Sequence, residues 1–339
     1  MRILIVTGIY PPEIGGPAQY AKRLAEEWQS GGHTIKVRIF SKFNFLPTGI
    51  RHLAFFFSIL PSVWWADNVL ALDTFSAALP GVLAAKLFGK KIIVRTGGDF
   101  LWEAYVERTR EPILLKDFYN TAFNKFSNKE RNIFKIIRYV LNRVDAIVWS
   151  TEWQKAIFME PYKLAEQKHF IVENYYPPVE QLEFDANVSG NEKIFWCPAR
   201  NIVIKNIEFL KQIFATVATQ HSGVILDLAT VDHDKIAEKI RSVYAVIIPS
   251  LSEISPNLVI DALRYCVPVL VTEENGIKER IDGFVKYIPP NDLERASLAV
   301  ASLLDQQNYS ELRDKIRRRA FTHSWGEMAQ EYLDIFKKI

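Results

Sequence analysis

Cysteine is scarce in this chain: its 339 residues include only two, Cys197 and Cys266. Two cysteines cannot form the disulfide framework of a small secreted domain, and nothing in their surroundings has the spacing of a zinc site. Both are flanked by apolar residues. We therefore expect two buried, reduced thiols.

Long apolar runs are missing as well. The longest run without a charge, Leu53–Ala66, is too short to span a bilayer. Met1 leads directly into an expected strand, so no signal peptide is recognised. Internal repeats and low-complexity segments are also absent from the sequence. These absences favour a cytoplasmic protein.

Short apolar segments alternate with stretches of helical periodicity along the chain. This alternation predicts an α/β protein with parallel sheets and helices on both faces. A length of 339 residues suits two domains, and 49% hydrophobic residues suffice for two cores. Strands are expected at Ile3–Thr7, Lys36–Phe40, Val69–Leu72, Lys91–Arg95, Ala146–Trp149, His169–Val172, Ile194–Pro198, Val224–Ala229, Ala245–Ile248, Val267–Thr272 and Lys286–Ile288.

Two acids flank the expected start of a helix in the second half. Glu253 and Asp261 follow the strand Ala245–Ile248. Ser255 is a favourable N-cap, and Pro256 suits the first helical position. Free N–H groups at a helix start attract phosphate, and carboxylates accept hydrogen bonds from hydroxyls. The pattern fits a ligand with a diphosphate between two sugars. The alternative is that Asp261 is an ordinary acid favoured by the helix dipole.

The segment Ser250–Leu263 resembles the donor-site motif of glycosyltransferase family 4, whose members are retaining enzymes of the GT-B fold that use nucleotide sugars. The second acid is usually Glu in that family and is Asp261 here. The resemblance implies that Glu253 binds hydroxyls of the donor sugar and that Asp261 binds the ribose. It assigns the turn beside the diphosphate to Ser255, Asn257 and Leu258.

The N-terminus carries the same resemblance. An apolar strand is followed by the turn-rich loop Pro11–Pro17 and then by helical spacing from Ala18 to Ser30. The family has a glycine loop here that faces the donor, and Gly15 and Gly16 let a backbone approach phosphate. A dinucleotide-binding fingerprint is the usual competitor. It needs G-x-G-x-x-G directly after the strand, whereas two prolines and an acid intervene here.

Two cations follow the strand Ile194–Pro198. The family clamps the donor diphosphate with an Arg and a Lys at the positions of Arg200 and Lys205. Fixed cations beside the leaving oxygen stabilise the transition state more than the ground state. The alternative is that both are soluble surface residues.

The loop after the strand Lys91–Arg95 departs from the family. Many relatives carry a His there, and this chain has Gly98 followed by Asp99. Asp99 fits the acceptor hydroxyl or the region of the anomeric carbon. Trp102 offers a face for a sugar ring, and Glu103 offers a hydrogen-bond acceptor. A turn in which Asp99 caps the next segment explains the pattern equally well.

The second half is shorter than is usual in the family. Only 43 residues separate Lys205 from Pro249, so one β-α unit is expected to be missing between Ala218 and Tyr244. Asp232 and Asp234 imitate an Asp-x-Asp metal motif, but a polar loop explains them better. We expect no metal and no cofactor other than the nucleotide-sugar co-substrate.

Positive charge gathers in the first half, which has 23 Lys and Arg against 16 Asp and Glu up to Tyr176, a net of +7. The helix expected over about 127–143 has one apolar and one basic face. Such a helix can contact anionic membrane. It can equally be a core helix with a solvated face. No recognisable nucleic-acid module interleaves the bases with aromatics, so no nucleic-acid partner is expected.

The sequence thus predicts a GT-B fold with a first domain over 1–176 plus a returning helix at about 324–339, and a donor-binding domain over 177–323. The expected function is retaining, metal-independent transfer of a hexose-type sugar from a nucleotide sugar to a glycan or lipid-linked acceptor, in cell-surface polysaccharide or glycoconjugate synthesis. The alternatives are a non-catalytic nucleotide-sugar or glycan-binding protein and a nucleotide-sugar epimerase of the same fold.

Overall fold

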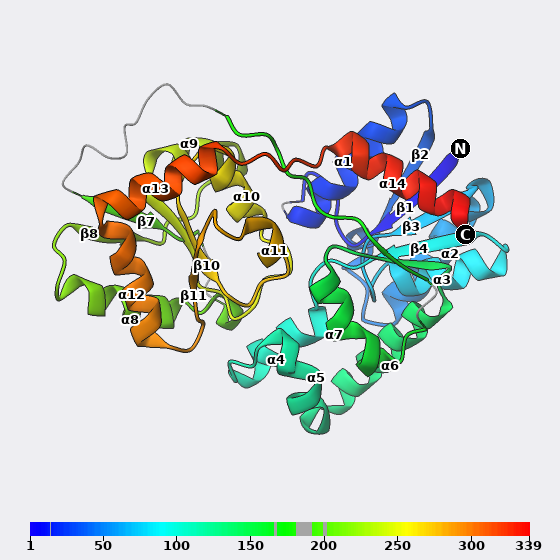
Figure 1. Cartoon of the computed structure of the whole chain (residues 1–339). Coiled ribbons are helices and arrows are strands. Elements are labelled where there is room, and N and C mark those ends of the chain that lie inside the picture. Colours follow the sequence, from blue (N-terminus) through cyan, green and yellow to red (C-terminus); the bar gives the residue numbers. More distant parts are fainter. Residues whose placement is uncertain (14, 166–167, 181–191, 199–201) are drawn as a thin grey trace. The chain divides into compact units, whose positions relative to one another are not determined.

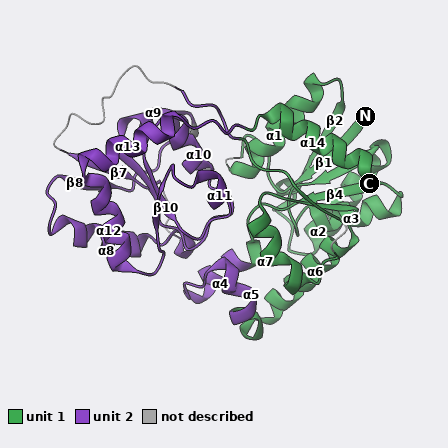
Figure 2. Ribbon diagram, viewed as in Figure 1, with its two compact units in different colours: residues 1–101, 122–175, 323–339 green, residues 102–121, 176–322 purple. Residues whose placement is uncertain are grey.

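The computed structural model describes residues 1–13, 15–165, 168–180, 192–198 and 202–339 (Figure 1). The chain forms two compact units (Figure 2). The first unit contains Met1–Leu101, Ala122–Tyr175 and His323–Ile339, and the second contains Trp102–Thr121 and Tyr176–Thr322. The sequence placed 102–121 in the first domain. The structure groups it with the second unit, whose loops it contacts.

The first unit is built on a six-stranded sheet in the order β2-β1-β3-β4-β5-β6. Every pairing in it is parallel. Apolar residues run along β1, β3, β4 and β5 without alternation, as expected of parallel strands that are covered on both faces. The strands are β1 (Arg2–Thr7), β2 (Thr34–Ile39), β3 (Asn68–Ala71), β4 (Lys91–Arg95), β5 (Ala146–Trp149) and β6 (His169–Ile171).

One face of this sheet is covered by α1 (Gly16–Ser30) and by the C-terminal helix α14 (Trp325–Lys338). The indole N–H of Trp28 donates to the carbonyl of Ala329 at 2.9 Å. The hydroxyls of Tyr20 and Tyr332 are 2.9 Å apart and buried. These contacts hold the end of the chain against its first helix.

The helices that follow β2 to β5 lie on the opposite face, as right-handed crossovers require. Gly81 permits the close approach of α3, because a Cβ there would lie 3.1 Å from Cγ2 of Val6 on β1. In this layer α2 packs on α3, α3 on α6, and α6 on α7. The helices are α2 (Ile50–Trp65), α3 (Ala78–Leu87), α6 (Asn128–Arg143) and α7 (Glu152–Tyr162).

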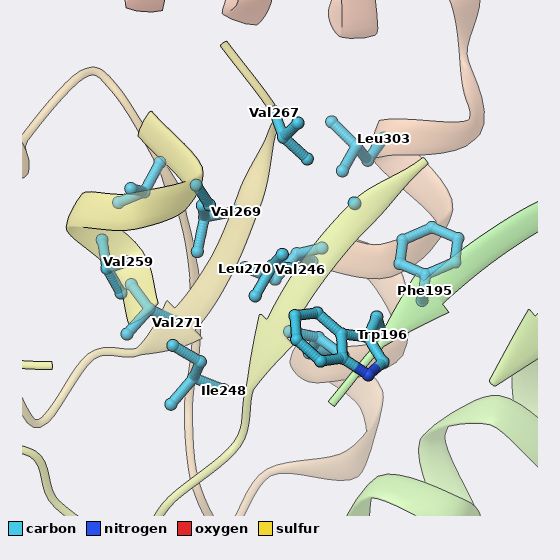
Figure 3. Packing of buried hydrophobic residues seen from close by; sticks show 14 of the residues in the cluster. Phe195, Trp196, Val246, Ile248, Val259, Val267, Val269, Leu270, Val271 and Leu303 are labelled. Carbon is cyan, nitrogen blue, oxygen red and sulfur yellow. The ribbon is translucent and has the colours of Figure 1, made fainter. Parts of the chain in front are cut away.

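The second unit contains a five-stranded parallel sheet in the order β11-β10-β9-β7-β8. Its core gathers Phe195, Trp196, Val246 and Leu270 from the central strands (Figure 3). The strands are β7 (Lys193–Trp196), β8 (Val224–Asp227), β9 (Ala245–Ile248), β10 (Val269–Thr272) and β11 (Lys286–Ile288).

The remaining helices belong wholly or largely to this unit. They are α4 (Phe100–Thr109), α5 (Leu115–Ala122), α8 (Ile207–Ala218), α9 (Ile236–Ser242), α10 (Asn257–Arg264), α11 (Lys278–Ile281), α12 (Leu293–Leu304) and α13 (Gln306–Arg317). Single 3-10 turns lie in both units, at Ser41–Phe43 and Phe123–Lys125 in the first and at Val203–Lys205 and His233–Lys235 in the second. Across the described residues no helix is both long and apolar enough to cross a membrane.

The predicted α/β class with two parallel sheets is confirmed, and all eleven predicted strands are present within two residues of their expected bounds. Cys197 and Cys266 are buried and form no disulfide, as predicted. Between Ala218 and Tyr244 the chain forms only β8, one 3-10 turn and the short α9.

Candidate active site

The candidate site of the second unit lies where three adjacent strands end. β7, β9 and β10 are neighbours in the sheet, and the loops that follow them carry Lys205, Glu253 and Glu274. Carboxyl ends of parallel strands lie at one edge of a sheet, where open α/β folds bind ligands. Residues far apart in sequence are brought together there.

Lys205 and Glu253 form an ion pair at this edge. The ammonium of Lys205 lies 2.6 Å from Oε1 of Glu253, and the hydroxyl of Ser250 donates to the same oxygen at 2.6 Å. The side chains are 29% and 16% exposed, so the pair is largely shielded but still reached by solvent. The structure thus joins two of the residues that the sequence assigned to catalysis.

The pair has electrostatic consequences for its neighbours. Burial acts to lower the pKa of Lys205, but the charge and hydrogen bond of Glu253 outweigh it, so that the pKa is raised and the ammonium stays charged. The charge of Glu103 on α4 adds to this rise in the pKa of Lys205. Burial raises the pKa of the nearby Cys197 thiol to about 12, which keeps that thiol neutral.

Backbone contacts fix the turn that presents Lys205. The N–H of Leu251 donates to the carbonyl of Ile204 at 2.9 Å, which ties the turn to the loop after β9. Asn206 adopts the left-handed conformation, with φ of 55°. Its side-chain amide donates to the carbonyls of Pro249 at 3.3 Å and Pro290 at 2.8 Å. One side chain therefore links three loops at the edge of the sheet.

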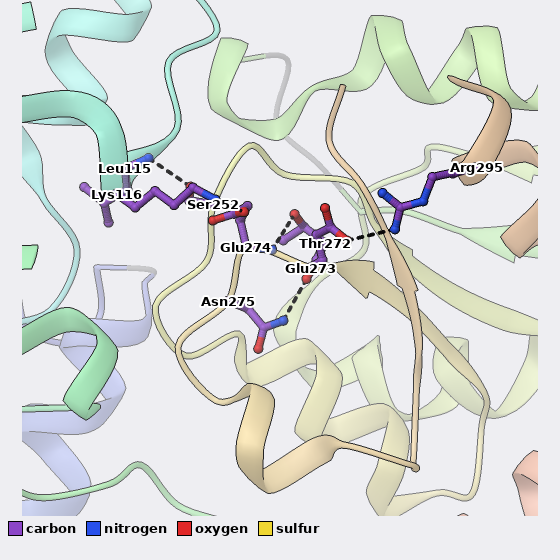
Figure 4. Close-up of polar contacts among 8 residues, drawn as sticks. All are labelled: Leu115, Lys116, Ser252, Thr272, Glu273, Glu274, Asn275 and Arg295. Carbon is purple, nitrogen blue, oxygen red and sulfur yellow. Dashed lines mark hydrogen bonds and ion pairs between the residues drawn. The ribbon is translucent and has the colours of Figure 1, made fainter. Parts of the chain in front are cut away.

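Glu253 is held by the loop after β10. Its N–H donates to the carbonyl of Glu274, and its carbonyl accepts from the N–H of Gly276, both at 2.9 Å. The buried Asn275 between them donates from its side chain to the carbonyl of Thr272 at 2.7 Å (Figure 4). Backbone pairing on both sides restricts the position of the Glu253 side chain.

The helix after Glu253 begins later than predicted. α10 runs from Asn257 to Arg264 with Pro256 as its N-cap, and the Pro256 side chain makes no capping hydrogen bond. The prediction of Ser255 as N-cap and Pro256 as first helical residue is therefore wrong by one position. Leu258 lies in the first turn and Asp261 one turn further on, so the predicted order of turn and second acid along this helix is present.

Helices α4 and α5 pack on this edge of the sheet. Oε2 of Glu107 accepts from the N–H of Val203 at 2.9 Å, at the start of the Lys205 turn. The hydroxyl of Ser252 accepts from the N–H of Leu115 at 3.0 Å. Lys116 forms an ion pair with Glu274, which raises the pKa of Lys116 (Figure 4). Residues 102–121 therefore belong to the wall of the site.

Two residues predicted on the acceptor side are buried. Trp102 is 3% exposed, and its indole N–H donates to the carbonyl of Ile113 at 2.8 Å. An indole covered in this way packs the helix and offers no face to a sugar, so the sugar-platform prediction is corrected. Asp99 is also 3% exposed, and its carboxylate accepts from the N–H of Leu101 at 3.0 Å, as in the capping alternative.

Gly15 and Gly16 lie in the first unit, at the start of α1. Gly15 is the N-cap, and a Cβ there would lie 2.9 Å from Cδ1 of Ile9. The carbonyl of Gly15 accepts from the N–H groups of Ala18 and Gln19. The approach of a phosphate to Gly15 and Gly16 stays a prediction.

Arg200 falls outside the described residues, so the structure gives no account of the second predicted cation. No group of three or more His, Cys, Asp and Glu side chains among the described residues could hold a metal ion. The predicted basic helix is α6, and Ser127 caps it in a capping box with Glu130. Arg131, Lys135 and Arg138 are exposed on it, as expected.

No protein-family model matches the sequence, and no curated protein does. Solved structures match over almost the whole chain at low identity. Sucrose-phosphate synthase from Thermosynechococcus elongatus is 12% identical with a TM-score of 0.72, over 99% of this chain and 98% of its own. HepE from Anabaena in complex with UDP is 11% identical with a TM-score of 0.67, over 100% of both chains. A glycosyltransferase from Rickettsia africae is 15% identical with a TM-score of 0.67, over 99% and 98%.

The chain has the GT-B fold. The sequence missed several residues of the site, namely Glu107, Ser250, Ser252, Glu274 and Asn275. A signal existed for Ser250, which lies three residues before Glu253 at the end of a buried strand. None existed for Glu107, because its partner Val203 is 96 residues away.

Proposed function

We propose that this protein is a retaining glycosyltransferase resembling family 4, which moves a hexose-type sugar from a nucleoside diphosphate to a glycan or lipid-linked acceptor in cell-surface polysaccharide or glycoconjugate synthesis. The proposal rests mainly on the ion pair of Lys205 and Glu253, which is largely shielded from solvent and precedes α10. It combines a cation for a leaving phosphate with an acceptor for sugar hydroxyls at the ligand-binding edge of a parallel sheet.

Lys205 carries the electrostatic part of the proposed reaction. Cleavage of the bond between the sugar and the phosphate leaves negative charge on the departing nucleotide. An ammonium of raised pKa remains charged at neutral pH and stabilises that charge as it develops. Arg200 is proposed as the second cation, with a fork suited to phosphate oxygens.

Glu253 and Asp261 are proposed to orient the donor. The carboxylate of Glu253 accepts hydrogen bonds from sugar hydroxyls, and Asp261 accepts from the ribose. The first turn of α10, with Asn257 and Leu258 after Ser255, is proposed to lie beside the diphosphate, because a helix start carries partial positive charge. Gly15 and Gly16 of the first unit are proposed as donor-binding residues from the resemblance alone.

In the proposed reaction the acceptor hydroxyl attacks the anomeric carbon from the face that the nucleotide leaves. The new glycosidic bond forms as the sugar–phosphate bond breaks. The hydroxyl proton goes to an oxygen of the departing diphosphate, so no protein base, metal or further cofactor is required. Asp99 and Glu103 are proposed on the acceptor side from the resemblance alone.

The structural neighbours are consistent with this proposal. HepE from Anabaena was solved with UDP-glucose, and starch synthase IV from Arabidopsis thaliana with ADP and acarbose. WaaG is described as a glycosyltransferase of lipopolysaccharide biosynthesis. We further propose a cytoplasmic location, with the basic helix α6 in contact with the inner face of the membrane.

Donor hydrolysis without acceptor tests the proposal. UDP-, GDP- and dTDP-sugars are incubated with the full chain, and released nucleotide is measured with and without EDTA. We expect nucleotide to be released from the sugars of only one of the three bases, and EDTA should not reduce this release. The Lys205→Ala and Glu253→Ala variants should release none. The matched control is Lys211→Ala, because Lys211 also pairs with an acid, Glu208 at 2.7 Å, but on the exposed side of α8.

The other outcomes indicate an alternative function or contradict the assigned site. Nucleotide-sugar binding with no turnover, even with candidate acceptors added, indicates a binding protein. Conversion of one nucleotide sugar into its epimer without nucleotide release indicates an epimerase. Equal activity of Lys205→Ala and Lys211→Ala contradicts the assigned site.

A further inference from the structure

Helix α2 of the first unit is apolar on both of its sides. Phe55, Ile59 and Val63 are fully buried against the sheet. The opposite side carries a stripe of apolar residues that face solvent. Their spacing of i, i+3, i+7 and i+14 places them on one face of the helix. Its members Ile50, Leu53, Phe57 and Trp64 are 55%, 57%, 60% and 70% exposed. A surface helix normally turns polar residues outward, so this stripe requires a separate explanation.

The exposed apolar surface continues beyond α2. Phe45, in the loop before it, is 79% exposed. Leu83 and Leu87 are exposed one turn apart on α3, which packs beside α2 (Figure 1). Clustered exposed apolar side chains on a folded protein mark an interaction surface.

The exposed charges on α2, α3 and α6 are all positive. α2 and α3 contain no Asp or Glu. The next helix, α6, exposes Lys129, Arg131, Lys135, Arg138 and Arg143. Its single acid, Glu130, is buried and engaged in the capping box. Lys135 and Arg138 lie with Tyr139 and Asn142 around a shallow hollow on this helix.

We propose that this layer docks on a membrane that contains anionic lipid, with the outer stripe of α2 inserted among the lipids and the cations of α6 at the headgroups. An interfacial helix needs this combination of an apolar face and nearby cations. α2 has only 16 residues and contains Pro61, so it is too short to span the bilayer. We therefore place it parallel to the membrane, at the boundary between lipid and water. At its far end, Lys36 sits 4.1 Å from the ring of Trp65 and adds a cation at headgroup level.

A second copy of the chain is the competing occupant. Two-fold pairing through α2 brings the same surface of each copy together. The acid-free faces of two α6 helices then lie near each other, and their cations repel. Anionic lipid complements both the apolar stripe and the cations, and therefore fits better.

The test is flotation of the full chain with vesicles of phosphatidylcholine, alone or with one part in three of phosphatidylglycerol. We expect binding to the anionic vesicles that weakens as salt is added. The double substitution Leu53→Glu and Phe57→Glu is expected to weaken binding about tenfold or more, because it removes the inserted apolar area. The matched control is Leu298→Glu, since Leu298 is 62% exposed on α12 of the other unit.

Three results overturn the proposal: no binding of the wild type to anionic vesicles, equal binding by the double variant and Leu298→Glu, or a wild-type dimer in solution that the double variant abolishes. If the double variant does not fold, Lys135→Glu with Arg138→Glu decides the matter, since it is expected to remove the salt-sensitive part of binding. The inference rests on the proposed membrane contact and not on glycosyl transfer, because vesicle binding is measured without donor or acceptor.

Discussion

The carboxylate of Glu107 accepts a hydrogen bond from the backbone N–H of Val203 at 2.9 Å, across 96 residues of sequence. Val203 opens the 3-10 turn that ends at Lys205. A helix inserted between β4 and β5 in the chain thus positions the cation of a site built by the second sheet. The placement of Lys205 depends on α4 as well as on its own loop.

Replacement of Glu107 by Ala tests this dependence. The turn loses a charged acceptor, and such a bond contributes about 1.5 kcal/mol or more, so we expect nucleotide-sugar affinity to fall about tenfold. Calorimetric titration of the donor found in the hydrolysis assay measures it. Arg110→Ala is the control, because it removes only the ion pair that Glu107 also makes with Arg110, the residue after the end of α4. Equal affinity of both variants would contradict the positioning role.

The attachment of α5 gives a second prediction. Ser252→Ala combined with Lys116→Ala removes the acceptor of the Leu115 N–H and the partner of Glu274. Each contact contributes about 1 kcal/mol, so we expect amides of α5 to exchange hydrogen several-fold faster. Hydrogen-exchange mass spectrometry on residues 115–121 measures the change. Lys211→Ala, which alters an exposed pair on α8, should leave these peptides as in the wild type.

The strands could be predicted because each is a short apolar run that the fold buries on both sides. Ala245–Ile248 is fully buried and was located to the residue. The bounds of β2 differ more, at Thr34–Ile39 against Lys36–Phe40, because this strand is at the edge of its sheet and is only partly buried. Periodicity locates a strand, whereas backbone pairing decides its last residue.

The site could be predicted only in part. Lys205 and Glu253 follow local patterns of strand, turn and helix, and the structure pairs them. Trp102 illustrates the limit, because local sequence does not reveal that the carbonyl of Ile113 and neighbouring side chains cover its ring. In the first unit, the burial of Arg95 likewise depends on partners from distant segments, Ser150 and Asn174.

The pair of His323, which precedes the C-terminal helix α14, and Glu331, which lies within it, predicts that stability depends on pH. His323 lies 3.3 Å from Glu331, and the hydrogen bond to Glu331 raises the pKa of His323 although burial opposes it. A raised histidine pKa gives stability that is complete below the ordinary value of 6.5 and is lost as pH rises through the raised pKa. We expect a loss of up to about 1 kcal/mol, the scale of a partly exposed ion pair.

Urea unfolding from acidic to mildly alkaline pH measures this loss. In Glu331→Gln the partner charge is absent, so the free energy of unfolding should vary less with pH over that range. Glu327→Gln is unsuitable as a control because Glu327 completes the capping box of α14. Asp334→Asn is suitable, since Asp334 pairs with Lys337 on the exposed side of the same helix. If the free energy of unfolding varies with pH equally in Glu331→Gln and the wild type, the pair of His323 and Glu331 does not cause the pH dependence.

Cys197 beside the Lys205–Glu253 pair gives the last prediction. Burial raises its pKa from an ordinary value of 9.0 to about 12, because the thiolate is poorly solvated there. The unfolded chain therefore ionises first as pH rises, and stability present below pH 9 is lost above it. Between pH 8 and about 10.5 this one thiol should reduce the free energy of unfolding by about 2 kcal/mol. The difference between the wild type and Cys197→Ser in urea unfolding isolates the effect, since other groups titrate equally in both. A difference that does not change with pH would show that the folded thiol ionises as readily as the unfolded one.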